Sequence, residues 1–437
     1  MAKGGYRSTL HACWLASASQ AIIVNLAPVL FTIFQDSFAV SHERLGRLIL
    51  VNFCVQMLTD IASVKLVPRL TVRRSMLIAH GALVLGLLLM GTLPFALPSP
   101  YVGLLIATVV YAIGGGLIEV LTSPIVDAVP GDAKPSEMSL SHSFYSFGQV
   151  ATVLLSTVFI RLFGNGHWQL LPLLWAVIPA INLVNFARVP LAPTLDEPAP
   201  LPVRRLFSSG LFVCASVLMI CAGAAEQTIA QWASLFAERG LRLSKLTGDL
   251  LGPMTFAVLM GAGRFWYGVL GKRLNIQRAL LACALLTAAS YALVVFGQPA
   301  LSLVGCALSG LAVSLMWPGV LSMTAEAFPT GGTAMFGVLA IFGDVGCSLG
   351  PWVAGVVSDA SQRSAALARP WAALTALPLF AGQDAEQIGL KSGILVAAIF
   401  PLLMVALVAA FGRARHPAVL AEGAAAAESV AAAEAAE

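Results

Sequence analysis

Asp127-Ala-Val-Pro130 and Phe147-Gly-Gln-Val150 return later in the chain as Glu326-Ala-Phe-Pro329 and Phe342-Gly-Asp-Val345. In both copies an acid and a proline close a long apolar segment, and Phe-Gly with a polar residue opens the next. The spacing between the two motifs is four residues longer in the first copy, so the match is imperfect. The repeat predicts a chain built from two related halves.

Composition predicts an all-α membrane protein. Hydrophobic residues make up 58% of the chain and charged residues 11%, whereas soluble domains carry about 25% charged residues. A membrane-spanning helix needs about 20 mostly apolar residues. Twelve segments meet this requirement, which predicts twelve helices in a lipid bilayer. The expected spans are residues 10–34, 44–67, 75–97, 101–127, 138–162, 168–189, 207–235, 246–271, 278–297, 300–326, 333–358 and 389–412.

The spans divide into two bundles of six helices. We expect an N-terminal bundle over residues 1–189 and a C-terminal bundle over residues 207–412, with a proline-rich cytoplasmic linker at 190–206. The Ala/Glu-rich tail at 413–437 is expected to be a solvated or frayed helix and not a further span. A membrane protein of two related halves is the usual plan of a secondary transporter, with a binding site between them.

The basic residues predict the orientation. More of the 25 Lys and Arg residues fall in loops on the side of the two termini than on the other side. Because cytoplasmic loops carry this excess, we expect a multi-pass protein of the inner or plasma membrane with both termini cytoplasmic. The bases form no cluster on a soluble module, which excludes a nucleic-acid-binding function.

Several other features are expected to carry no chemistry. Ala16-Ser17-Ala18 resembles a signal-peptidase site, but the apolar run continues through Phe34 and favours an uncleaved first helix. The seven cysteines are scattered, so neither a disulfide framework nor a metal site is expected. No phosphate-binding loop of the ATPase type is present, which points to the proton gradient as the energy source, with no cofactor.

Polar residues inside the first bundle are candidates for proton coupling, because ionisable groups in a span are expensive and usually functional. Glu119 follows Gly114-Gly115-Gly116, where small residues allow close helix contact. His142, Tyr145 and Gln149 share one face of the next helix and are positioned to meet Glu119. A carboxyl group in apolar surroundings can load and release a proton near neutral pH. Glu119 is the predicted proton carrier and His142 a secondary one; the alternative is a structural hydrogen bond between helices.

The seventh span carries the best candidates for solute binding. Glu226, Gln227, Gln231 and Trp232 combine a carboxylate, two amides and an indole, which suit a hydroxyl-rich ligand stacked on an aromatic ring. The alternative is that the amides join helices and that the indole lies in the interfacial aromatic belt. The matching helix of the first half offers two further binding candidates, Gln20 and Asn25.

The second half adds an acid and two helix-breaking patterns. Asp344 lies near mid-depth and is a further coupling candidate, as is Glu226. Gly346-x-x-x-Gly350-Pro351-x-x-x-Gly355 predicts close helix packing and a kink. Trp317-Pro318 predicts a break whose freed carbonyl groups line the cavity, so Trp317 is a binding candidate.

Opposite charges occupy matching places in the two halves. Asp60 in the second span and Arg264 in the eighth superpose when the halves are aligned on their following loops. They are predicted to form a gating salt bridge in one state of the transport cycle. The alternative for Arg264 is a buried ion pair with Asp344.

The chain resembles the major facilitator superfamily over residues 8–412. Within it, Met138-Ser-Leu-Ser-His142-Ser-Phe-Tyr145-Ser-Phe-Gly148-Gln149 and Glu226-Gln-x-x-x-Gln231-Trp232 are similar to segments of the fucose-permease-like sugar transporters. The resemblance implies twelve helices in two pseudo-symmetric bundles. It also implies that Glu119 corresponds to the fourth-helix carboxylate that such permeases use for proton coupling.

The superfamily loop pattern Gly-x-Leu-x-Asp-Arg-x-Gly-x-Arg is only partly kept. In its first copy Leu66, Arg69 and Arg73 fit, but Pro68 replaces the aspartate. In its second copy the basic pair Lys272-Arg273 remains, and Lys272 stands in the place of the aspartate. By resemblance, the gating residues are Arg69, Arg73, Lys272 and Arg273. The acid expected in the first helix of fucose symporters is missing, which leaves Asn25 or Gln20 there.

These observations predict a monomeric secondary transporter that takes up a small polar solute, with a sugar favoured, by proton coupling and alternating access. The nearest alternative is an exporter of drugs or metabolites with the same fold. Such antiporters resemble a pattern with Gly-Pro in the fifth helix, and this fifth helix contains no proline. An intramembrane enzyme would need motifs that are missing, such as His-Glu-x-x-His. A non-transporting sensor is disfavoured because the interior carboxylates remain.

Overall fold

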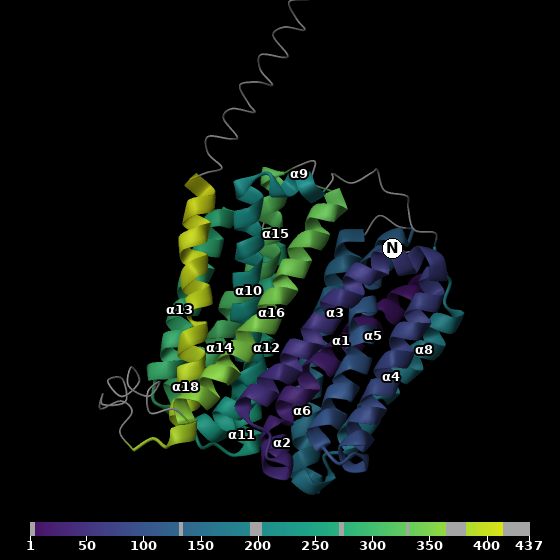
Figure 1. The fold of residues 1–437 in the computed structure, drawn as a ribbon. Helices are drawn as coiled ribbons and strands as arrows, with labels where there is room; N and C mark the ends of the chain where they lie inside the picture. Colours follow the sequence, from purple (N-terminus) through teal and green to yellow (C-terminus); the bar gives the residue numbers. More distant parts are fainter. Residues whose placement is uncertain are drawn as a thin grey trace, which may run out of the picture.

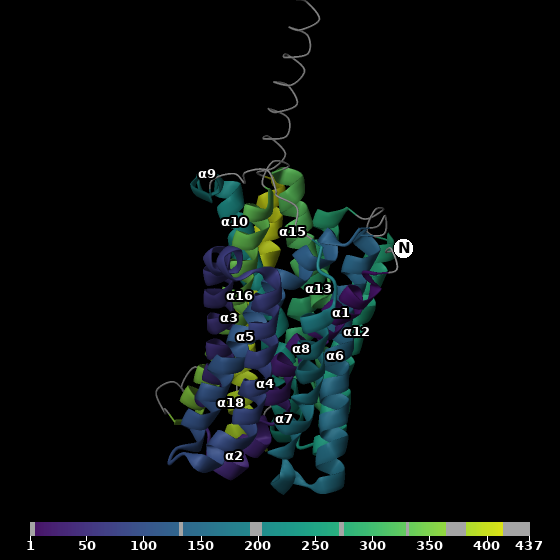
Figure 2. The same cartoon turned by 90° about the vertical axis from the view of Figure 1, so that its right-hand side faces the viewer.

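The computed structural model describes residues 5–130, 134–192, 203–270, 275–328, 332–363 and 382–413. Within these ranges every regular element is helical, and the long helices form two bundles that stand side by side (Figure 1). Turning the molecule by 90° shows that the long helices run roughly in one direction along it (Figure 2). The all-helical membrane fold predicted from composition is confirmed.

The first bundle contains the elements before the linker. Their bounds are α1 Arg7–Val29, α2 Phe31–Phe38, α3 His42–Leu70, α4 Val72–Ala96, α5 Pro100–Ala128, α6 Lys134–Phe163, the short 3-10 turn η1 Asn165–His167, α7 Leu170–Trp175 and α8 Val177–Arg188.

The second bundle follows a short helix, α9 Val203–Phe207. Its elements are α10 Gly210–Leu235, the π-helical turn η2 Phe236–Gly240, α11 Lys245–Asp249, the π-helical turn η3 Leu250–Met254, α12 Thr255–Leu270, α13 Ile276–Phe296, α14 Pro299–Val313, α15 Met316–Ala327, α16 Gly332–Arg363 and α18 Ala385–Ala397, with further helix over residues 399–413. The linker residues 193–202 and the tail from residue 414 lie outside the described residues.

The helices match the expected spans closely. Among the described residues, 11 helical segments are long and apolar enough to cross a membrane. The remaining expected span, 246–271, corresponds to α11, η3 and α12, which follow one another without a gap from Lys245 to Leu270. The π-helical turn η3 divides this span into α11 and α12, each of which is too short to cross a membrane by itself.

A proline breaks the tenth span of the chain. Helix α14 ends at Val313, residues 314–315 form a turn, and α15 begins at Met316. Pro318 has no N–H to donate to the carbonyl of Ser314 four residues earlier, so the regular helix cannot continue there. The break predicted from Trp317-Pro318 is therefore present.

Glycines let the fifth spanning helix of each bundle pack tightly on the first helix of that bundle. A Cβ on Gly346 would lie 2.1 Å from the carbonyl oxygen of Ile220 in α10. In the first bundle, a Cβ on Gly148 would lie 2.9 Å from Cα of Ala18 in α1. Gly148 belongs to the first Phe-Gly motif, whereas Gly346 follows the second motif, so the two contacts join corresponding helices through glycines at different positions of the repeat. The close packing predicted for Gly346 is confirmed, and α16 remains a continuous helix through Pro351.

Candidate functional site

A cavity of 470 Å³ lies between the two bundles and has polar side chains from both in its wall. The first bundle contributes eight polar side chains to its wall: Ser17, Gln20, Gln56, Glu119, Thr122, Ser123, Ser141 and Tyr145. The second bundle contributes six side chains that carry polar atoms: Glu226, Gln227, Arg264, Tyr267, Trp317 and Asp344. A depression of 540 Å³ on the second bundle alone is lined almost entirely by apolar side chains and offers a polar solute nothing to bind.

Glu119 projects into this cavity from α5. Its Oε2 accepts a hydrogen bond of 2.9 Å from Nε2 of Gln20 in α1. The adjoining helix, α3, approaches α5 closely because Gly116 has no side chain. A Cβ there would lie 2.7 Å from the carbonyl oxygen of Gln56 and 2.8 Å from Oδ1 of Asp60. The glycine run before Glu119 thus makes room for a second carboxylate beside it.

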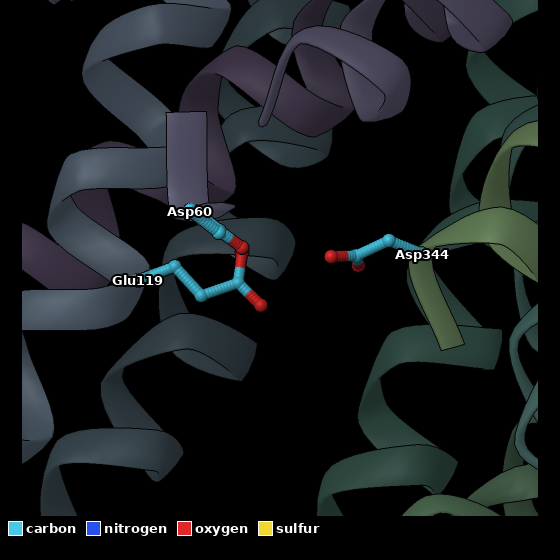
Figure 3. A group of neighbouring side chains, drawn as sticks. All are labelled: Asp60, Glu119 and Asp344. Carbon is cyan, nitrogen blue, oxygen red and sulfur yellow. The ribbon is translucent and has the colours of Figure 1, made fainter. Parts of the chain in front are cut away.

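Three carboxylates meet at one wall of the cavity. Asp60 of α3, Glu119 of α5 and Asp344 of α16 each offer one oxygen, and these oxygens lie within 4.8 Å of one another. Figure 3 shows Asp344 pointing from the second bundle toward the pair in the first. We call these three residues the acidic cluster. Sequence reasoning identified each acid but not their convergence, because it depends on how two helices from different halves face each other.

A separate ion pair occupies the wall formed by the second bundle. Nη2 of Arg264 in α12 lies 3.4 Å from both carboxylate oxygens of Glu226 in α10. In this conformation Arg264 is therefore paired within its own bundle, and not with Asp60 or Asp344. The salt bridge predicted between Asp60 and Arg264 stays a prediction for another state of the protein.

Some of the predicted solute-binding residues line the cavity, and the others lie outside its wall. Gln20, Tyr145, Gln227 and Trp317 line the cavity. The ring of Trp317 lies against Gly343, where a Cβ would come within 2.2 Å of the indole.

Two further candidates stand behind the wall. Nδ2 of Asn25 donates to the carbonyl of Ala21 at 2.8 Å, and Asn25 also shares a hydrogen bond with Tyr145. Gln149 is buried in the helix packing and does not line the cavity. Asn25 is thus placed to orient Tyr145.

Gln231 and Trp232 lie beyond the cavity, in the contact between the bundles. Nε2 of Gln231 donates to Oε1 of Gln227 at 3.0 Å and to the carbonyl of Val24 at 3.4 Å. Trp232 is 2% exposed and donates its indole N–H to the carbonyl of Pro351 at 3.0 Å. A ring buried in this way cannot stack on a solute in the cavity, so in this conformation Trp232 is part of the contact between the bundles.

The bundles are latched together at the face opposite the chain termini, a feature that sequence analysis missed. Asp359 near the end of α16 accepts hydrogen bonds from the backbone N–H groups of His42 at 3.1 Å and Glu43 at 3.0 Å. It therefore caps the N-terminus of α3 from the other bundle, where helix N-termini favour negative charge. The buried His42 ring also lies 3.5 Å from an oxygen of Glu386. The sequence carries no signal for this contact, because an acid at the end of an apolar run is common in ordinary loops.

A second interbundle contact at this face is centred on Asp249 of α11, which is 1% exposed. It accepts hydrogen bonds from Thr157 of the first bundle at 2.7 Å and from Ser234 at 2.5 Å. Nζ of Lys245 lies 3.1 Å from Oδ2 of the same carboxylate. The exposed pair Asp36 and Arg239 adds an ion pair nearby.

Lys245→Met is expected to destabilise the protein by about 3 kcal/mol, because it leaves the buried Asp249 carboxylate without its cation. The thermal unfolding midpoint in detergent measures this loss. The double variant Lys245→Met with Asp249→Asn is the control and should recover most of the stability. Equal stability of the single variant and the parent protein would show that the ion pair contributes nothing.

The family model of the Major Facilitator Superfamily matches residues 13–362. The chain belongs to the Major Facilitator Superfamily. This is a family of transporters, which assigns the cavity to transport and not to catalysis. A search of curated proteins gave no match.

Solved transporter structures of this superfamily share the fold. A bacterial homologue of the human lysosomal transporter Spinster, inward-facing and occupied, has 15% identity and a TM-score of 0.73, covering 94% of this chain and 98% of that one. The D-xylose-proton symporter has 14% identity and a TM-score of 0.70, covering 91% and 97%. The E. coli fucose:proton symporter has 18% identity and a TM-score of 0.60, covering 94% and 99%. At these identities the likeness establishes the fold alone.

The basic residues predicted from the Major Facilitator Superfamily loop pattern have different surroundings. Arg73 donates to the carbonyls of Phe186 at 2.7 Å and Val189 at 2.8 Å, so it caps the C-terminal end of α8 within its own bundle. Arg69 is exposed on the last turn of α3. Lys272 and Arg273, and the side chain of His142, lie outside the described residues. Their predicted roles in gating and coupling stay predictions.

Proposed function

We propose that this protein is a secondary active transporter that takes up a small polar solute, with a sugar as the favoured class, by proton coupling. The observation that carries the proposal is Glu119, a half-buried carboxyl group between helices whose open side faces a polar cavity shared by both bundles. An ionisable side chain that faces a cavity inside a membrane bundle is a usual element of a proton pathway. Sugar:proton symporters among the structures that share the fold are consistent with this function.

The cavity offers a sugar the contacts that hydroxyl groups need. Its volume of 470 Å³ lies within the range of roughly 300–1,000 Å³ for small-molecule sites. Gln227 and Tyr145 supply hydrogen-bonding groups from opposite bundles, and Trp317 supplies an aromatic face. A solute held by both bundles draws them together, which links binding to the change in access.

Alternating access follows from the latch at one face. The bonds of Asp359 and Asp249 join the bundles at the face opposite the termini. The protein is expected to lie in an inner or plasma membrane with both termini in the cytoplasm. The closed face is then the outer one, and this conformation is inward-facing. A monomer is sufficient for the cycle, because both bundles belong to one chain.

Uptake into proteoliposomes tests the function. Purified protein is reconstituted, the outside is acidified, and a panel of radiolabelled sugars, nucleosides and other polar metabolites is offered. We expect at least one solute to accumulate, and accumulation to stop when a protonophore removes the gradient. Liposomes without protein are the control. Export of lipophilic cations without accumulation of any polar solute would favour an exporter instead.

A further inference from the structure

Little positive charge lies around the acidic cluster. The neighbouring cation, Arg264, has its guanidinium 3.4 Å from Glu226 and is engaged there. Glu119 receives one amide hydrogen bond, from Gln20. Three carboxylate oxygens within 4.8 Å of one another repel strongly when ionised, and a low-dielectric site screens this repulsion poorly.

Two oxygens of the cluster lack any hydrogen-bond partner among the described residues. Asp344 is 3% exposed, and its buried Oδ2 has no partner. The buried Oδ1 of Asp60 has none either. Figure 3 shows both side chains directed toward the space between α3, α5 and α16. A buried carboxylate oxygen that points at other carboxylates and accepts no hydrogen bond is a suitable ligand for a cation.

The spacing fits a small cation. Carboxylate oxygens bind hard metal ions at about 2.3–2.6 Å and ammonium groups at about 2.8 Å. Three oxygens at such distances around one centre lie within about 5 Å of each other, as the 4.8 Å limit of the cluster requires. All three ligands are carboxylate oxygens, which bind hard metal ions in preference to the softer ions that favour nitrogen or sulfur ligands.

We propose that Asp60, Glu119 and Asp344 form a cation site that bridges the two bundles. Its occupant is a sodium-sized metal ion or the ammonium group of a transported amine. The inference deepens the proposed function, since it adds a second coupling ion or a charged substrate class to the same cavity. Because two ligands come from the first bundle and one from the second, binding joins the bundles at the depth of the cavity. Opening of the site to either side would release that contact.

Thermal unfolding of the full chain in detergent tests this directly. Sodium chloride and methylammonium chloride are titrated separately at neutral pH, with tetramethylammonium chloride at equal ionic strength as the control. We expect a saturable rise in the unfolding midpoint with at least one of the first two salts. Asp344→Asn should weaken the apparent affinity by about tenfold or more, because it removes one formal charge at the same shape. Asp36→Asn, which removes an exposed acid at the far face, should keep the rise.

Tryptophan fluorescence provides a second readout if Asp344→Asn folds poorly. The Trp317 ring lies on Gly343, the residue before Asp344, so cation binding should change its emission. Trp317→Phe should lose that fluorescence change but keep the thermal shift. The signal is measured on the parent protein at cation concentrations that leave ionic strength constant.

Each outcome decides the inference. A shift with sodium alone identifies a metal site, and a shift with methylammonium identifies an amine site; both support the proposal if Asp344→Asn weakens them. No shift with either salt, or a shift that Asp344→Asn retains in full, overturns it. Proton-driven uptake of a neutral sugar by a protein without a cation effect leaves the proposed function standing. A cation effect without proton-driven uptake leaves only the cation site.

Discussion

Glu119→Gln should abolish accumulation of solute by an imposed proton gradient. The amide has the size of the acid and can still hydrogen-bond to Gln20, so the cavity wall keeps its shape. It cannot take up and release a proton, and the coupling step is therefore lost. We expect gradient-driven uptake to fall by at least about 100-fold, which corresponds to about 2.7 kcal/mol. Proteoliposome uptake with the best substrate of the panel measures this.

Solute exchange separates a coupling defect from a binding defect. In proteoliposomes with equal pH on both sides and unlabelled solute inside, Glu119→Gln should still exchange labelled solute, since this process needs no net proton movement. Glu197→Gln, an acid-to-amide change in the linker sequence, is the matched control and should accumulate solute like the parent protein. Accumulation by Glu119→Gln at the parental level would contradict the role of this residue as proton carrier.

A disulfide across the latched face should stop transport reversibly. The Cβ position of Gly46 in α3 lies 3.1 Å from Cα of Trp352 in α16, so cysteines at the two positions are within bonding reach. In the double variant Gly46→Cys with Trp352→Cys, oxidation should lock the bundles at this face. Transport is expected to fall to a few per cent or less of the reduced protein, and a reductant should restore it.

The single variants Gly46→Cys and Trp352→Cys control for the substitutions, since neither can form this bond. The second also measures the loss of the hydrogen bond of 3.3 Å from Trp352 to Glu43. Restoration by a membrane-impermeant reductant added to cells from outside would place the latched face outside. Undiminished transport by fully cross-linked protein would exclude an alternating-access cycle that opens this face.

The fold was predictable because apolar length and glycine spacing are local properties of the chain. Runs of about 20 apolar residues leave little choice but a membrane helix, and they fixed all the spans, including the one that η3 divides. Gly346 and the run Gly114-Gly115-Gly116 predicted close helix contacts for the same reason. The sequence does not reveal which neighbour each glycine meets, since that depends on bundle topology.

The site was predictable residue by residue but not as an arrangement. Glu119, Glu226 and Asp344 were recognisable because charged groups are rare inside spans. Their pairing was not, because it depends on helix rotation: Arg264 lies against Glu226, and Asp60 lies with the other two acids. From sequence, the Trp232 indole could pack between helices or bind the solute. The hydrogen bond from its N–H to the carbonyl of Pro351 identifies it as a packing residue in this conformation.

The cap that Asp359 places on α3 has a mechanical consequence. Two of its bonds end on backbone N–H groups, and water can replace a carboxylate at such a helix end at a penalty of only about 1 kcal/mol. The contact is therefore specific but weak: it favours one arrangement of the two bundles and opposes their separation only slightly. When the bundles separate, the first turn of α3 is exposed to solvent and the rest of the helix stays intact. Asp359 can therefore bind the same helix N-terminus again in each transport cycle.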